Sequence, residues 1–176
     1  MDRLGPLARR ASLVRVSLAS FLAQLLNGLA GASSLFLVAV GLTLIFGVTR
    51  VVNFAHGSLY MLGAYLAWTF VGIFGRGPLG FWGAVMLAAL FVAAIGALIE
   101  RFLLKRIYAA PELLQLAATF GIVLIVRDAT LAIWGAEDLL GPRAAGFTGA
   151  VDLFGHAVPS YDLLLLGIAP LVLVAL

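Results

Sequence analysis

Val51 to Gly75 reads VVNFAHGSLYMLGAYLAWTFVGIFG, a stretch with no Asp, Glu, Lys or Arg and a single histidine, His56. A helix needs about 20 predominantly apolar residues to cross the hydrocarbon core of a bilayer. Val51–Gly75 reaches this length, and its composition therefore predicts a membrane-spanning helix. Three polar side chains, Asn53, His56 and Ser58, gather in its first part.

Similar apolar stretches lie on both sides of this segment. Val16–Thr49 and Gly77–Ile99 are uncharged, Leu113–Ala136 is apolar apart from one charged pair, and a last apolar run continues to Leu176. We therefore expect an all-α fold, a polytopic transmembrane helix bundle that forms a single domain over residues 1–176. The expected spans are 21–48, 58–74, 81–99, 113–134 and an incomplete 161–176.

The overall composition supports the lipid bilayer as the surroundings of this chain. Hydrophobic residues make up 64% and charged residues 11% of the 176 residues, against about 45–50% and 25% in soluble domains. The mean hydropathy of +1.16 agrees with this. The net charge is +3, but the basic residues are scattered between apolar runs, so we expect no nucleic-acid partner.

No pattern of catalytic or metal-ligating residues is visible. The chain has no cysteine and two histidines, and the spacings H-E-x-x-H and G-x-x-x-x-G-K-[ST] are both absent. The single lysine, Lys105, follows Leu104 and not a glycine. We therefore predict a protein that is not an enzyme, with no metal and no cofactor. If ATP drives its activity, another subunit hydrolyses the ATP.

The charges of two connections predict an orientation in the membrane. Residues 100–112 contain three basic side chains, whereas residues 137–160 are mainly acidic. Cytoplasmic loops are enriched in Lys and Arg, so we expect residues 100–112 to be cytoplasmic and residues 137–160 to be external.

The basic amino terminus conflicts with this orientation. Arg3, Arg9, Arg10 and Arg15 favour a cytoplasmic start, but three crossings before residue 100 require an external one. Either the first apolar stretch forms two short passes around Gly28 and Gly31, or the basic segment is translocated. We favour a single pass, because two passes need about 40 residues.

The polar cluster at the start of Val51–Gly75 predicts a broken helix near residues 53–58. Such a break is tolerated at membrane depth only where it is buried in protein or lines a cavity. Transporters use the end of a half-helix in this way to meet charged groups of a substrate. We therefore expect a helix that resumes near Ser58 with its amino-terminal end facing inward. Alternatively, the polar side chains only form hydrogen bonds with neighbouring helices. The candidate pathway residues are Asn53, Phe54, His56, Gly57 and Ser58.

Two further groups of residues are candidates for a role inside the membrane. Arg127 and Asp128 form a possible intramembrane polar site, because ionisable groups at this depth are usually functional; alternatively, Arg127 extends toward the interface. Ala89, Ala93 and Ala97 recur at four-residue spacing, which predicts a close contact between helices.

Three motifs around the polar cluster resemble one transporter family. Gly41–Val48 (GLTLIFGV), Val52–Gly57 (VNFAHG) and Met61–Tyr65 (MLGAY) are similar to the signature of the bacterial branched-chain amino acid ABC transporter permeases, and the similarity extends over about residues 20–136. The resemblance implies an inner-membrane permease subunit that imports branched-chain or hydrophobic amino acids. It also implies a second homologous permease subunit, two cytoplasmic ABC ATPases and a periplasmic substrate-binding protein as partners. Family members are nearly twice as long, so we expect this chain to be the amino-terminal part of a longer permease.

Two alternative functions remain open from the sequence. The same architecture could carry urea, short amides or another small polar solute. A membrane channel or scaffold without energy coupling is the alternative from a different class.

Overall fold

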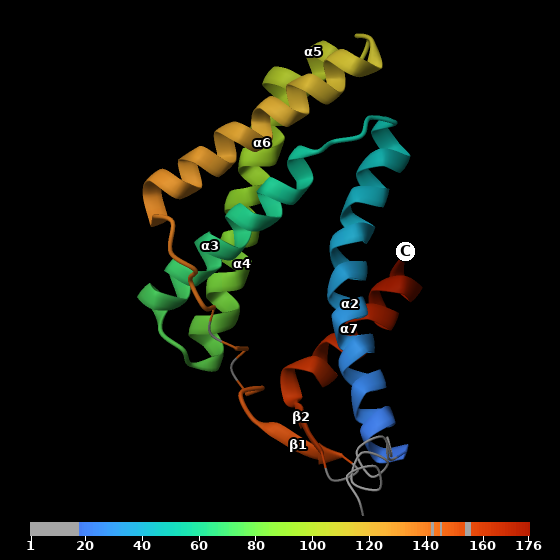
Figure 1. The fold of residues 1–176 in the computed structure, drawn as a ribbon. Helices are drawn as coiled ribbons and strands as arrows, with labels where there is room; N and C mark the ends of the chain where they lie inside the picture. The colour runs from blue at the N-terminus through green and yellow to red at the C-terminus, as the bar shows by residue number, and fades with distance from the viewer. Residues whose placement is uncertain (1–17, 142, 145, 154–155) are drawn as a thin grey trace, which may run out of the picture. The chain divides into compact units, whose positions relative to one another are not determined.

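A computed structural model of the chain describes residues 18–141, 143–144, 146–153 and 156–176 (Figure 1). The four arginines of the basic amino terminus lie outside the described residues. The helices are α2 (Leu18–Thr49), α3 (Ala55–Phe74), α4 (Pro78–Ile99), the π-helical turn η2 (Glu100–Leu104), α5 (Lys105–Ile107), α6 (Glu112–Trp134) and α7 (Ser160–Ala175). Two short strands, β1 (Ala150–Leu153) and β2 (His156–Pro159), complete the described elements.

Four helical segments are long and apolar enough to cross a membrane. They are Ser20–Thr49, Ala55–Phe74, Pro78–Ile107 and Glu112–Trp134. Many large apolar side chains on them face outward, among them Ile73 and Ile125, as expected where the solvent is lipid. The predicted all-α, polytopic helix bundle is confirmed. The last helix, α7, is apolar but has only 16 residues.

The first apolar stretch forms one uninterrupted helix. α2 runs for 32 residues through Gly28 and Gly31. The alternative of two short passes around these glycines is therefore wrong. A helix of apolar residues tolerates isolated glycines, each of which costs only about 1 kcal/mol relative to alanine.

The connection expected at residues 100–112 is mostly helical. α4 continues through η2 and α5, so that only residues 108–111 join it to α6. The sequence from Phe102 to Ile107 contains good helix formers, and Lys105 and Arg106 lie in the last turn, where a positive charge is favourable. The charges thus lie at the end of a long helix and not in a loop.

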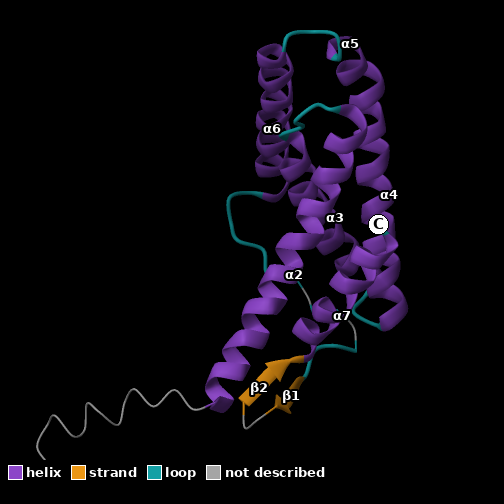
Figure 2. Cartoon of the chain, turned by 90° about the vertical axis from the view of Figure 1, so that its right-hand side faces the viewer, coloured by secondary structure: helices purple, strands orange, loops and turns teal. Residues whose placement is uncertain are grey.

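The chain divides into two compact units, which are described separately. In the first unit, which joins residues 1–34 to 149–176, β1 and β2 pair as an antiparallel hairpin (Figure 2). Val151 pairs with Val158 in this hairpin. The backbone N–H and the Oγ of Ser160 both donate to the Gly149 carbonyl, over 3.0 and 2.9 Å. This hairpin lies within residues 137–160, which we expected to be a loop.

In the second unit, residues 35–148, α3 packs against both α4 and α6 (Figure 1). The α3–α4 turn is tight: Gly75 has a φ of +88°, and a Cβ on Gly80 would lie 2.5 Å from the Gly75 carbonyl oxygen. At the other contact, the Trp134 Nε1–H donates to the Thr69 hydroxyl over 2.8 Å. The carboxyl-terminal part of α3 is thus fixed to α4 and to α6 by specific local geometry.

The face of α4 that contacts α3 differs from the one predicted. Ala84 and Ala88 are buried, whereas Ala89, Ala93 and Ala97 are all exposed. The predicted alanine series therefore does not form the helix contact within the described chain. The alanines of α4 that are buried have the same four-residue spacing but lie one position earlier.

Candidate functional site

The interruption lies between α2 and α3, at residues 50–54, and not within residues 53–58 as predicted, because α3 runs unbroken from Ala55 to Phe74. α2 ends at Thr49, Arg50 has a φ of +54°, and α3 begins at Ala55. The Thr49 hydroxyl donates to the Ile45 carbonyl over 2.8 Å and accepts from the Val51 N–H over 3.3 Å. These bonds hold the end of α2 as the chain turns toward α3.

Asn53 closes the first turn of α3. Its side chain is 7% exposed, and its Oδ1 accepts from the Ala55 N–H over 3.0 Å. The His56 N–H donates to the Asn53 carbonyl over 3.2 Å. The helix therefore starts at Ala55 and not near Ser58 as expected, and Asn53 accepts from the N–H groups of Ala55 and His56. Ser58 is buried within this turn, where its hydroxyl donates to the Ala55 carbonyl.

The start of α3 lies beside the middle of another apolar helix. Ala55 is fully buried and clusters with Leu104, Ile122 and Val126. Ile122 and Val126 are central residues of α6, which is long enough to cross the membrane. The first residue of α3 therefore packs against the middle of α6.

His56 connects α3 to the second half of α2. Its Nε2–H donates to the Val38 carbonyl over 3.2 Å. Its ring lies so close to Gly41 that a Cβ there would be 2.8 Å from Cε1. This is the helix-to-helix bond that the packing interpretation predicts. Phe54 and Gly57, by contrast, are exposed.

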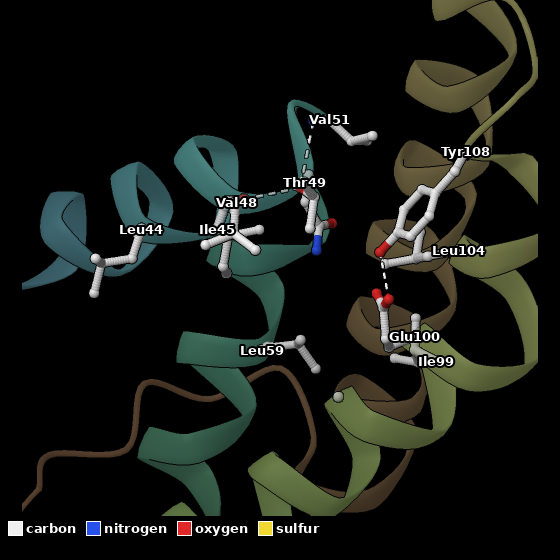
Figure 3. Close-up of a pocket in the computed structure, with 12 residues that line it drawn as sticks. Leu44, Ile45, Val48, Thr49, Val51, Leu59, Ile99, Glu100, Leu104 and Tyr108 are labelled. Carbon is white, nitrogen blue, oxygen red and sulfur yellow. Dashed lines mark hydrogen bonds between the residues drawn. The ribbon is translucent and has the colours of Figure 1, made fainter.

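A cavity of about 400 Å³ opens next to the interruption (Figure 3). Its walls come from the end of α2, the connection to α3, the first part of α3, and the end of α4 with η2. Among the predicted pathway residues, Asn53 lines this cavity, whereas Phe54, His56, Gly57 and Ser58 do not. The lining residues are Leu44, Ile45, Val48, Thr49, Val51, Asn53, Leu59, Gly96, Ile99, Glu100, Leu104 and Tyr108.

Glu100 and Tyr108 contribute polar groups to the cavity that the sequence analysis did not select. The two side chains point toward each other, and the Tyr108 hydroxyl donates to Glu100 Oε1 (Figure 3). Burial, together with this bond and the charge of Glu100, raises the pKa of Tyr108 to about 12. A sequence signal existed, because Glu100 follows directly on the uncharged run Gly77–Ile99.

Arg127 and Asp128 are both exposed. Arg127 lines a second cavity of about 210 Å³, together with Tyr65, Glu137 and Asp138. Asp128 does not line it. Over the described ranges, no three His, Asp or Glu side chains lie close enough together to hold a metal ion.

Comparisons with known proteins identify the family. The family model for permease components of branched-chain amino acid transport systems matches residues 24–176. The high-affinity branched-chain amino acid transport permease BraD of Pseudomonas aeruginosa is 31% identical over 63% of this chain and 38% of its own length. The corresponding permease LivH of Escherichia coli is 29% identical over 69% of this chain and 41% of its own length.

An archaeal relative gives a similar result. The probable LivH permease of Methanocaldococcus jannaschii is 34% identical over 69% of this chain and 37% of its own length. The chain thus spans about two fifths of the length of these relatives. No solved structure matches it. Since the family model covers most of the residues and the helices have the expected length, the chain belongs to the permease components of branched-chain amino acid transport systems.

Proposed function

We propose that this chain is part of the membrane-spanning subunit of an ATP-driven importer for branched-chain and other hydrophobic amino acids. The observation that carries the proposal is the family match over residues 24–176. The subunit would lie in the bacterial inner membrane. Its partners would be a second homologous permease, two cytoplasmic ABC ATPases that hydrolyse the ATP, and a periplasmic substrate-binding protein.

We further propose that the Asn53–Ser58 segment forms part of the substrate route. Three features support this role: the helix is interrupted where the segment begins, the start of α3 lies beside the middle of α6, and Asn53 lines the cavity of about 400 Å³. Ligand sites are typically apolar cavities with a few polar groups. An apolar wall with an amide and a carboxylate suits an amino acid that has an aliphatic side chain.

The test of the route uses alanine variants of the full-length permease, assembled with its partners. Asn53→Ala and His56→Ala should lower leucine uptake sharply, because the first removes a cavity group and the second releases α2 from α3. Thr43→Ala is a suitable control: Thr43 is exposed on α2, bonds only to its own helix at the Ala39 carbonyl, and does not line the cavity.

Assembly is measured for each variant by co-purification of the ATPase subunits. Parental uptake by both assembled variants would contradict the route and favour the packing interpretation. Failure of both to assemble would also show that the segment is structural. In the parental complex, transport of urea in preference to leucine would favour the alternative cargo, and leucine flux without ATP would favour an uncoupled channel.

A further inference from the structure

The cavity beside the α2–α3 interruption contains four residues with polar side-chain groups, and two of these, Thr49 and Tyr108, already use their hydroxyl protons in hydrogen bonds within the chain. The Thr49 hydroxyl both donates and accepts within the end of α2. The Tyr108 hydroxyl donates to Glu100. The remaining two residues, Asn53 and Glu100, each use one oxygen and keep a second polar atom.

These two free atoms have opposite hydrogen-bonding character. Asn53 uses Oδ1 for the Ala55 N–H, and its Nδ2 amide has no bonding partner among the described residues. Glu100 accepts the Tyr108 hydroxyl at Oε1, and its Oε2 has no hydrogen-bond partner among the residues that the structure describes. The cavity therefore offers one amide donor and one carboxylate acceptor. The rest of its lining is almost entirely aliphatic.

The backbone around Glu100 is unusual for a residue that only packs. Glu100 begins η2, a π-helical turn inserted between α4 and α5. Such turns are rare and occur frequently at functional sites. The segment also lies within Pro78–Ile107, which is apolar enough to span a membrane. A carboxylate at such a position is costly and usually has a functional partner.

We propose that Glu100 binds the α-ammonium group of an aliphatic amino acid in this cavity, and that Tyr108 positions the Glu100 carboxylate. The Asn53 amide would donate to the substrate carboxylate, and Val48, Leu59 and Ile99 would contact its side chain. The volume of about 400 Å³ lies in the range of about 300–1,000 Å³ that is typical of small-molecule sites. This inference rests on the proposed function and specifies how the substrate is recognised.

The ligand side of the proposal can be tested without any substitution. In the assembled permease–ATPase complex, without the binding protein, binding of radiolabelled leucine is measured in competition with two analogues. Isoamylamine has the ammonium group but no carboxylate, and 4-methylpentanoate has the carboxylate but no ammonium group. We expect the amine to compete at least about tenfold better than the acid, because the ammonium group pairs with the charged carboxylate of Glu100, whereas the acid meets the neutral Asn53 amide and is repelled by Glu100.

Substitutions then assign this preference to Glu100. Glu100→Gln should weaken leucine binding about tenfold or more and remove the preference for the amine. The glutamine can still accept the Tyr108 hydroxyl, so a purely structural bond would survive this change. Tyr108→Phe should weaken binding less and keep the preference, since the carboxylate remains. Glu112→Gln, at an exposed glutamate at the start of α6, should change nothing.

The outcomes distinguish this inference from the proposed function. If the parental complex transports leucine but Glu100→Gln retains parental affinity and preference, Glu100 is not the ammonium site although the importer function stands. Should Glu100→Gln fail to assemble, equal competition by the amine and the acid in the parental complex would overturn the inference. If the parental complex neither binds nor transports leucine, both proposals are wrong.

Discussion

A methyl group added at Gly41 should collide with His56, and the resulting energetic coupling can be worked out from the structure. The added Cβ would lie 2.8 Å from Cε1 and 3.0 Å from Nε2 of the histidine ring. If the ring moves away, it loses its bond to the Val38 carbonyl, which is worth about 0.5–1.5 kcal/mol. If the ring cannot move, overpacking costs about 1–3 kcal/mol.

The same substitution also has a favourable effect, because alanine stabilises a helix interior by about 0.5–1 kcal/mol relative to glycine. In the parental protein the two effects oppose each other, so Gly41→Ala should range from nearly neutral to about 2 kcal/mol destabilising. In a His56→Ala background the collision is absent, and Gly41→Ala should stabilise the protein. We therefore expect a coupling energy of about 0.5–3 kcal/mol, the range that the two outcomes span.

The assay is equilibrium unfolding of the purified permease in mixed micelles, with sodium dodecyl sulfate as denaturant, for the parent, both single variants and the double variant. Gly47→Ala is the matched control, because it lies on the same helix and a Cβ there meets nothing within 4 Å. Its effect should be the same in both backgrounds. If Gly41→Ala also has equal effects with and without His56, within about 0.3 kcal/mol, the His56 contact with α2 is wrong.

Three further predictions follow from local geometry. Gly80→Ala should destabilise the permease by about 1–3 kcal/mol or more, because the added Cβ would collide with backbone oxygens, which cannot move without distorting the turn. Gly83→Ala is the control in the same unfolding assay, because a Cβ at Gly83 meets no atom within 4 Å. The pKa of Tyr108 is raised to about 12 from the usual value of about 10, so the neutral hydroxyl stabilises the folded protein fully below pH 10, and this stabilisation is lost as the pH rises toward 12. The temperature of thermal unfolding should therefore fall less steeply between these pH values in Tyr108→Phe than in the parent. Parallel curves for the two proteins would contradict this. Cysteines at Ala109 and Thr148, in a chain without natural cysteines, test the orientation: an impermeant reagent should label 148 but not 109 in intact cells, and the reverse would overturn it.

The helices could be predicted from the sequence because the length and composition of an apolar run are local properties. Glu112–Trp134, for example, differs from the expected span 113–134 by one residue at its start. The helical continuation beyond α4 was harder to predict, because the charged residue Glu100 indicated the start of a connection. Hydrogen bonding continues the helix through η2 and α5 instead, and nothing in a charge count indicates a π-helical turn.

The contacts between helices could not be predicted in the same way. A helix that is apolar on all sides carries no polar face to mark its exposed side, so the spacing of Ala89, Ala93 and Ala97 could not show which face packs. Asn53 could be identified from the sequence as a polar residue in an apolar run, but the cavity that it lines could not, because a cavity depends on which helix faces meet. Glu100 and Tyr108 line that cavity through contacts between α4, η2 and the connection before α3, which only the folded chain brings together.

The central proposal is that this chain belongs to a permease that moves hydrophobic amino acids with energy from ATP hydrolysis. The most direct measurement is uptake of radiolabelled leucine into proteoliposomes that contain the full-length permease, its homologous partner subunit, the ATPases and the binding protein. With the ATPase subunits facing the lumen, we predict that leucine uptake requires ATP inside the proteoliposomes. Unlabelled isoleucine and valine should inhibit this uptake, whereas urea should not. Absence of ATP-dependent leucine uptake from a fully assembled complex would contradict the proposal.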